Sequence, residues 1–124
     1  MCGFALVVAK NRKALAIDDK ILAYRGPDYT EELDFGWSRL RHWRLSIQDL
    51  TSNSNQPVND EECCLAYNGE LYDFKTIGNK LFGIDFASDT LLLFQVLKNG
   101  DFDELKYESG FYSFVFISKN EKSI

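Results

Sequence analysis

The residue with the clearest chemical potential is Cys2, the second residue of the chain. Removal of Met1 would leave a thiol and a free α-amine on one residue, so that a nucleophile and a general base stand together. Their ordinary pKa values, about 8.5 for the thiol and about 7.7–8.0 for the amine, make proton transfer between them nearly balanced at neutral pH. A cysteine at this position also occurs by chance, so the rest of the chain decides whether it is a nucleophile.

The other cysteines and the single histidine favour structural roles. Cys63 and Cys64 are neighbours in an apolar run typical of a strand, which directs their side chains to opposite faces. Three cysteines are an odd count, and neither a disulfide framework nor a metal cluster fits this spacing. One histidine, His42, cannot form a multi-histidine metal site. We therefore expect buried thiols at 63 and 64, and neither a metal nor another cofactor.

The composition limits the size of the domain and the class of partner. The chain has 124 residues, of which 45% are apolar, enough for one compact domain and too few for two. A formal net charge of −5 offers no basic surface for nucleic acid or for a membrane, so partners should be small molecules or another protein. The apolar run at residues 3–9 is too short to span a bilayer and lacks the basic start of a secretion signal, which favours a cytoplasmic protein.

Hydrophobic periodicity predicts an α+β or α/β domain in which helices cover a sheet. Strands are expected at residues 3–9, 33–40, 43–47, 62–67 and 110–118. Helices are expected at residues 13–23, 72–82, 89–98 and 103–107. Ser88 is a suitable N-cap for the third helix and Asn99-Gly100 a suitable end, while Asn68-Gly69 predicts a turn after the fourth strand.

Five short polar motifs follow Cys2 along the chain. They are Arg25-Gly26-Pro27-Asp28, the run from His42 to Ile47, Gln56-Pro57, the run from Tyr67 to Tyr72, and Ser88-Asp89-Thr90. In this order and spacing the set resembles the glutaminase domain of class II glutamine amidotransferases, which are N-terminal-nucleophile hydrolases. The Arg-Gly-Pro-Asp and Arg-Leu-Ser-Ile sequences resemble the asparagine-synthetase branch, and the resemblance runs from Met1 to about Phe116.

The resemblance implies a fold and a reaction. The fold is an αββα sandwich that here stops before the last strands, so residues 1–124 would form a C-terminally incomplete glutaminase domain with no synthetase domain. Cys2 would attack the side-chain amide of L-glutamine, while the Asn68 side chain and the Gly69 backbone N–H form the oxyanion hole. The products are glutamate and ammonia, and the ammonia would pass to a separate asparagine-synthetase-like partner.

The resemblance also implies the residues that bind glutamine. Arg44 would bind the α-carboxylate through its planar guanidinium, and Asp89, together with Glu70, would bind the α-ammonium. The segment that follows the arginine would complete the pocket, with Leu45, Ser46, Ile47 and Gln48. Arg25 and Asp28 are expected to be architectural and to hold the loop that closes over the nucleophile.

Several positions depart from the family pattern or have a simpler interpretation. Tyr24 stands where histidine is usual, Asp73 where asparagine is common, and Leu91 where glutamate is frequent. None of these changes removes a reacting group. Without the motif set, Arg44 would be interpreted as a salt-bridging arginine, and Asp89 as a charge favoured at the start of a helix.

Two alternative functions remain open. The first is a catalytically inactive or truncated relative that binds glutamine or a partner protein without turnover. The second is a papain-style hydrolase that uses Cys2 and His42, which would need an orienting Asn or Asp and a larger scaffold. In every case the apolar strand at residues 110–118 is expected to lie at a contact with a second copy of the chain or with a synthetase partner.

Overall fold

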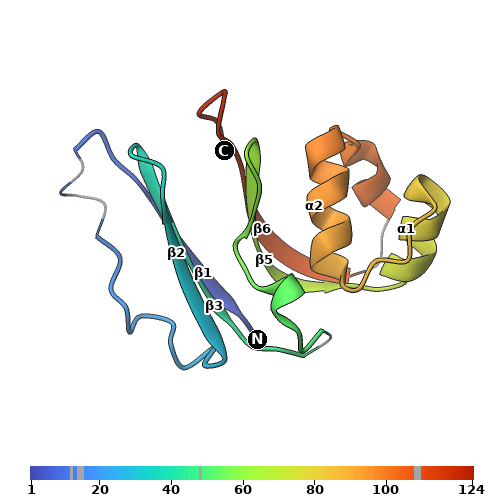
Figure 1. The fold of residues 1–124 in the computed structure, drawn as a ribbon, viewed down its shortest axis with the longest axis horizontal. Helices are drawn as coiled ribbons and strands as arrows, with labels where there is room; N and C mark the ends of the chain where they lie inside the picture. Colours follow the sequence, from blue (N-terminus) through green and yellow to red (C-terminus); the bar gives the residue numbers. More distant parts are fainter. Residues whose placement is uncertain (12, 14–15, 48, 108–109) are drawn as a thin grey trace.

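Two facing sheets and two helices make up the part of the chain that the structure describes, residues 1–11, 13, 16–47, 49–107 and 110–124. In this computed structural model both helices cover the outer side of the second sheet (Figure 1). The first sheet, of order β1-β3-β2, contains β1 (Gly3–Val8), β2 (Tyr29–Asp34) and β3 (Ser38–Arg44). The second, of order β4-β5-β6, contains β4 (Val58–Asn59), β5 (Cys63–Leu71) and β6 (Gly110–Ser118). The remaining elements are α1 (Phe74–Phe82), α2 (Asp89–Asn99), and the 3-10 segments η2 (Ser52–Ser54) and η3 (Phe102–Tyr107).

All strand pairs in both sheets are antiparallel. The predicted α+β class is therefore confirmed, and the arrangement is compatible with a sandwich. In the described residues, no helix is long and apolar enough to cross a bilayer.

The start of α2 and the C-terminal ends of both helices follow from local sequence. The Ser88 side chain accepts the N–H of Leu91 at 3.4 Å and so caps α2. Gly83 and Gly100 end α1 and α2 in the left-handed conformation, with φ of 66° and 79°. The predicted α2 is confirmed to within one residue, and α1 starts at Phe74, two residues later than predicted.

The core has two layers, because side chains of β5 alternate between them. Cys64 and Ala66 pack between the sheets, where Leu40 and Ile117 join them. The intervening residues of β5 face the helices in a cluster of Leu65, Tyr67, Leu71, Leu93 and Leu97. Both Cys63 and Cys64 are buried free thiols, as predicted. Burial raises the pKa of Cys64 to about 12 and also raises that of Cys63, so both thiols are held in the neutral form.

The helix predicted at residues 13–23 is wrong for the part of it that the structure describes. Residues 16–28 run along the outer side of the first sheet as coil and turns (Figure 1). Their hydrogen bonds join residues three apart, such as Ile21 N–H to the Asp18 carbonyl at 3.3 Å. The indole N–H of Trp43 donates to the Asp19 carbonyl at 3.1 Å, and Arg41 pairs with the Asp19 carboxylate. The first sheet thus binds the Asp19 carbonyl, which a helix would use for its own hydrogen bonds. Ile21 remains 56% exposed.

Three strand predictions also need correction. The strand predicted at residues 33–40 is two strands, β2 and β3, joined by a hairpin turn in which Gly36 has φ of 83°. The strand predicted at residues 43–47 is the end of β3, which stops at Arg44. Asn68-Gly69 does not end β5, because β6 pairs with β5 along its whole length, as far as Leu71 opposite Gly110. Pairing with a distant strand therefore overrides the local turn signal.

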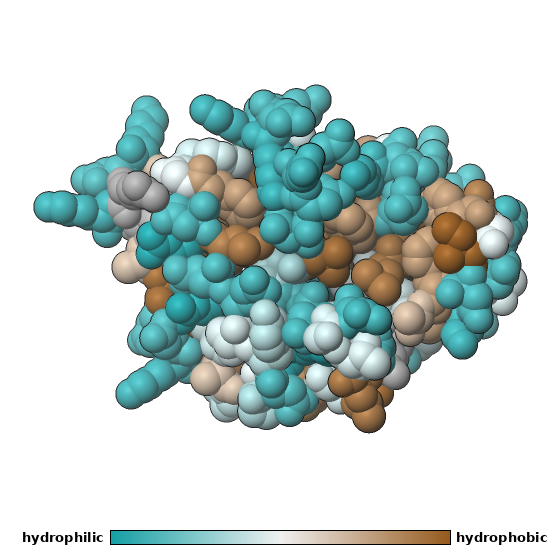
Figure 2. Space-filling view, in the orientation of Figure 1, coloured by the Kyte–Doolittle hydropathy of each residue, from teal (hydrophilic) through white to brown (hydrophobic). Residues whose placement is uncertain are grey.

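Strand β6 has the predicted bounds but is covered over only half of its length. Phe114 and Phe116 pack toward the helices, and Val115 and Ile117 pack between the sheets. The other end is open, with Phe111 53% exposed. β6 is also an edge of the second sheet. On the face of the molecule that Figure 2 shows, the hydrophobic residues form separate patches between hydrophilic ones.

We expect the chain to self-associate or to bind a partner chain through β6, because an edge strand offers unpaired backbone groups beside exposed aromatic side chains. Light scattering of the protein alone should give a mass that rises with concentration toward twice that of the chain. Tyr112→Lys should abolish the rise, whereas Tyr24→Lys, at an exposed position of the N-terminal turns, should not. A monomer of unchanged mass at every concentration, with no partner bound, would contradict this expectation.

Candidate functional site

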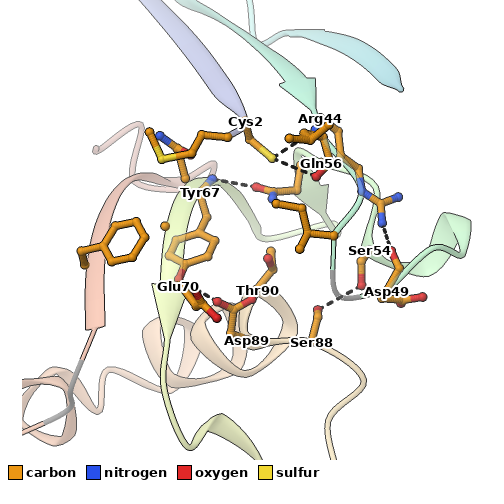
Figure 3. Close-up of a pocket in the computed structure, with 16 residues that line it drawn as sticks. Cys2, Arg44, Asp49, Ser54, Gln56, Tyr67, Glu70, Ser88, Asp89 and Thr90 are labelled. Carbon is orange, nitrogen blue, oxygen red and sulfur yellow. Dashed lines mark hydrogen bonds between the residues drawn. The ribbon is translucent and has the colours of Figure 1, made fainter. Parts of the chain in front are cut away.

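A cavity of about 240 Å³ opens between the sheets near the N-terminus. Side chains from both sheets, from the loop after β3 and from the start of α2 surround it (Figure 3). The lining residues are Met1, Cys2, Arg44, Leu45, Ile47, Asp49, Ser54, Gln56, Tyr67, Asn68, Gly69, Glu70, Ser88, Asp89, Thr90 and Phe111. The volume is slightly below the range of about 300–1,000 Å³ typical of sites for drug-sized ligands, which suits a small molecule.

Most of the residues that the sequence singled out converge on this cavity. The lining includes Cys2, Arg44, Leu45, Ile47, Asn68, Gly69, Glu70 and Asp89. Ser46 lies beside the lining, and its N–H binds the Asp28 carboxylate at 2.7 Å. Gln48 lies outside the described residues. Among the described residues, no group of three His, Cys, Asp or Glu side chains could hold a metal ion.

The thiol of Cys2 is held against the backbone of Leu45. The Leu45 N–H donates to the sulfur at 3.3 Å, and the thiol donates to the Leu45 carbonyl at 3.5 Å. Cys2 is half-buried, just before β1, and Met1 beside it lines the cavity and is 57% exposed. The sulfur therefore stands at the cavity wall, in a position fixed by the start of the loop after β3.

The segment Arg25-Gly26-Pro27-Asp28 holds the backbone of Cys2 and of the end of β3 in place. Arg25 Nε donates to the Cys2 carbonyl at 3.2 Å, and the Asp28 N–H donates to the Arg44 carbonyl at 3.0 Å. A Cβ at Gly26 would lie 2.2 Å from the Trp43 carbonyl oxygen, so only glycine fits there. These contacts agree with the architectural role expected of Arg25 and Asp28.

Arg44 is 5% exposed, and the loop after β3 surrounds its guanidinium. Nη1 donates to the Thr51 carbonyl at 2.9 Å and to the Asn55 side chain, and Nη2 donates to the Asp49 carbonyl. These bonds use three of the five N–H donors of the guanidinium. The Asp49 carboxylate lies in the same loop, where hydrogen bonds from Thr51 and Ser54 lower its pKa. Arg44 thus brings a compensated positive charge to the cavity wall.

Asp89 brings a negative charge to the cavity from the first turn of α2. The residue is 4% exposed, and its Oδ2 accepts the Tyr67 hydroxyl at 2.8 Å and the Leu71 N–H at 3.0 Å. Burial and the Asp89 charge raise the pKa of Tyr67, so the phenol stays protonated and remains a donor. Asp89 therefore ties α2 to β5, which a surface charge at a helix start would not do.

Asn68 and Gly69 lie on β5, opposite Ser113 and Tyr112 of β6. A Cβ at Gly69 would lie 2.2 Å from the Phe111 carbonyl oxygen and 2.5 Å from Tyr112 Cα, and φ at Gly69 is 156°. Glycine is required here because the two strands approach so closely.

Two buried side chains bind the backbone of Tyr67, next to Asn68, and the sequence did not indicate these contacts. The Gln56 Oε1 accepts the Tyr67 N–H at 2.7 Å, and His42 Nε2 binds the Tyr67 carbonyl at 3.1 Å. Gln56 is named in the sequence only as part of a motif, and His42 is expected to pack or to support the residues that contact the substrate, with a papain-style catalyst as the alternative. No local signal distinguishes them, because His42 stands between Arg41 and Trp43 and Gln56 follows the polar run 51–55.

Comparison with known proteins assigns the class of this domain. The family model for the glutamine amidotransferase domain matches residues 1–124, and the chain belongs to this family. Amidase chyE of Penicillium rubens is 30% identical over 107 residues, which cover 82% of this chain and 16% of that protein.

Asparagine synthetases are similar over almost the whole chain. Asparagine synthetase [glutamine-hydrolyzing] 2 of Arabidopsis thaliana is 28% identical over 134 residues, which cover 99% of this chain and 23% of that protein. The asparagine synthetase of Zea mays is 29% identical over 133 residues, with 99% and 22% covered. The chain thus spans less than a quarter of the length of these curated relatives, and it is a glutamine amidotransferase domain of the asparagine-synthetase type.

The buried His42 should make folding sensitive to acid. Burial lowers its pKa from the ordinary 6.5 to about 4; the Arg44 charge acts in the same direction, and the bond to the Tyr67 carbonyl opposes both. Between pH 6.5 and pH 4 the unfolded chain therefore binds a proton that the folded chain does not. The free energy of unfolding consequently decreases as the pH is lowered through this range, by about 3 kcal/mol in total.

In urea titrations at pH 7, 5.5 and 4, His42→Gln should lose this part of the pH dependence. Ser38→Ala, at a buried position on the same face of β3, should keep it. Carboxylates with lowered pKa, such as Asp49 and Asp60, contribute equally in all three proteins. Identical pH dependence of the His42→Gln protein and the wild type would refute the assignment.

Proposed function

We propose that residues 1–124 form a glutaminase domain that hydrolyses L-glutamine to glutamate and ammonia, with Cys2 as the nucleophile once its α-amine is free. The observation that carries this proposal is that the Cys2 thiol, held by the Leu45 backbone, lines the same small cavity as Asn68, Gly69 and Asp89. Family membership supports the reaction class. This function would correspond to the αββα sandwich of the N-terminal-nucleophile hydrolases, of which the described residues supply two sheets and the helices on one of them.

The reaction would proceed in two steps through a thioester. The α-amine takes the thiol proton, and the sulfur attacks the side-chain amide carbon of glutamine. The side-chain amide of Asn68 and the Gly69 N–H donate to the oxyanion that forms. The tetrahedral intermediate collapses as the protonated α-amine of Cys2 gives its proton to the amide nitrogen of glutamine, which departs as ammonia. Water then attacks the thioester with the amine again as base, and glutamate is released.

Opposite charges at the cavity wall would bind the two charged groups on the α-carbon of glutamine. Arg44 would bind the α-carboxylate, with the backbone of Leu45 and Ile47 beside it. Asp89 and Glu70 would bind the α-ammonium, and the Tyr67 hydroxyl holds Asp89 in place for this role. The distribution of charge therefore favours a free amino acid over a peptide.

The ammonia would pass to a separate asparagine-synthetase-like partner chain. The support is the similarity to proteins whose names describe glutamine hydrolysis and asparagine synthesis, of which this chain covers less than a quarter.

A glutamine-binding module without turnover is the second candidate. Met1 lines the cavity, and while it is attached the α-amine of Cys2 is part of a peptide bond and cannot act as a base.

The nucleophile can be tested with a diazoketone analogue of glutamine. The analogue should add to Cys2, and not to Cys63 or Cys64, because the buried thiols are held neutral. Cys2→Ala should lower glutamate release by about 10³-fold or more, and a form that retains Met1 should be equally inactive because the base is lost. Intact-mass measurement of the N-terminus identifies the form assayed. Labelling mainly at Cys63 or Cys64, or full activity of the form that retains Met1, would show that Cys2 is not the nucleophile.

The recognition of the α-ammonium is tested with Asp89→Asn, which keeps the acceptor for Tyr67 but removes the charge. Loss of a charged hydrogen bond should weaken glutamine binding by about 10- to 100-fold. Binding of an analogue that lacks the α-amine should change much less. Asp85→Asn, at an exposed carboxylate before α2, serves as the control. Equal losses for both compounds would leave Asp89 with only its structural role at the start of the helix.

A further inference from the structure

The backbone of Tyr67 lies on β5 beyond the point where the neighbouring strand β4 ends. β4 pairs Val58 with Leu65 and Asn59 with Cys64. Continued in the same register, the chain would place Gln56 opposite Tyr67, but β4 has only two residues and Pro57 before it has no N–H to donate. On this edge β5 therefore continues past the end of its partner strand.

Two side chains from elsewhere bind this unpaired backbone. Gln56 Oε1 accepts the Tyr67 N–H at 2.7 Å. The Tyr67 carbonyl binds His42 Nε2 at 3.1 Å, and because a carbonyl oxygen only accepts, Nε2 carries the hydrogen. Gln56 and His42 are both buried. A side chain of the loop and a side chain of the other sheet thus hold the N–H and the C=O of one residue.

The carbonyl that His42 holds belongs to the peptide that joins Tyr67 to Asn68. A peptide unit is planar, so fixing its carbonyl fixes the plane in which the Asn68 N–H and Cα lie. The direction of the Asn68 side chain and of the next peptide, which carries the Gly69 N–H, depends on that plane. On the other edge of β5, β6 holds the same two residues through their pairing with Ser113 and Tyr112.

We propose that His42 and Gln56 are positioning residues that clamp the backbone of Tyr67, His42 at the peptide that leads to Asn68 and Gln56 at the peptide before it, and so aim the donors of the oxyanion hole, an inference that rests on the proposed glutaminase function. Neither side chain touches the reacting atoms in this role. Preorganised donors stabilise the transition state only when they are aimed at the developing charge, and a misplacement of about 1 Å can cost about 10²-fold in rate.

The surroundings of His42 favour positioning over packing. Its neighbours between the sheets include Phe4, which is its pairing partner on β1, and the buried Leu40 on β3. An apolar ring would fill this space, yet the chain has an imidazole there, and its Nδ1 is buried with no partner among the described residues. The hydrogen bond to the Tyr67 carbonyl is thus what an imidazole provides that a phenyl ring cannot.

The test compares variants that remove a contact with one that keeps it. His42→Phe and Gln56→Met remove the donor and the acceptor at similar side-chain volume. Each should lower kcat for glutamate release by about 10- to 100-fold and leave KM within about threefold, because the contact matters only in the transition state. His42→Gln, which keeps an N–H donor, should recover most of the kcat. Ser38→Ala, buried on the same strand, is the control for disturbance of the interlayer core.

The double variant His42→Phe/Gln56→Met adds a second criterion. If both side chains act through the backbone of Tyr67, the loss of kcat in the double variant should be clearly smaller than the product of the two single losses. Wild-type kcat in both single variants would overturn the proposal, and so would a loss carried by KM alone or failure of His42→Gln to recover activity.

Hydrogen exchange keeps the clamp testable without an assay of activity. The Tyr67 amide should exchange at least about tenfold faster in Gln56→Met than in the wild type, while the Leu93 amide in the core of α2 should be unchanged. Unchanged protection of Tyr67 in an active protein would overturn the clamp alone. Absence of glutamate release from wild-type protein with a free Cys2 amine would instead refute the proposed function, and the oxyanion role with it.

Discussion

The structure depends on a single strand, β5, being buried on both faces. Its side chains contribute alternately to the layer between the sheets and to the layer beneath the helices, so a shift of one residue would exchange the two sets. That constraint fixes the register at Asn68, where the strand leaves the apolar core and reaches the cavity. The close approach of β6 at Gly69 fixes it a second time, because any other residue there would collide with the Phe111 carbonyl. The position of the site along the strand therefore follows from packing.

The two buried charges at the cavity wall, Arg44 and Asp89, are each held by hydrogen bonds. Arg44 donates to the loop after β3, and Asp89 accepts from a phenol and a backbone N–H. An uncompensated buried charge would cost several kcal/mol, so these bonds are what permits two opposite charges at one small cavity. They also hold both groups in place before a ligand arrives, which reduces the reorganisation that binding requires.

The sequence predicted best those features that local chemistry decides. The caps of α2 at Ser88 and Gly100 are examples, because a side-chain oxygen and a glycine act on their immediate neighbours. Most of the expected site residues also line one cavity, since the order of the motifs carries that information. The failures are features decided at a distance. Trp43 and Arg41 hold residues 16–28 as turns, and β6 pairs straight across Asn68-Gly69, which a local interpretation takes as a turn.

The loop that surrounds Arg44 has a consequence for how this surface can vary. Two of its three acceptors are main-chain carbonyls, those of Asp49 and Thr51, and every residue type supplies a carbonyl. The side chains of Leu50, Ser52 and Asn53 meanwhile point into solvent. Related sequences can therefore exchange these exposed positions widely and keep the arginine in place. The solvent-facing side of this loop is free to diverge, for example to suit different neighbouring proteins, while the cavity wall keeps its charge.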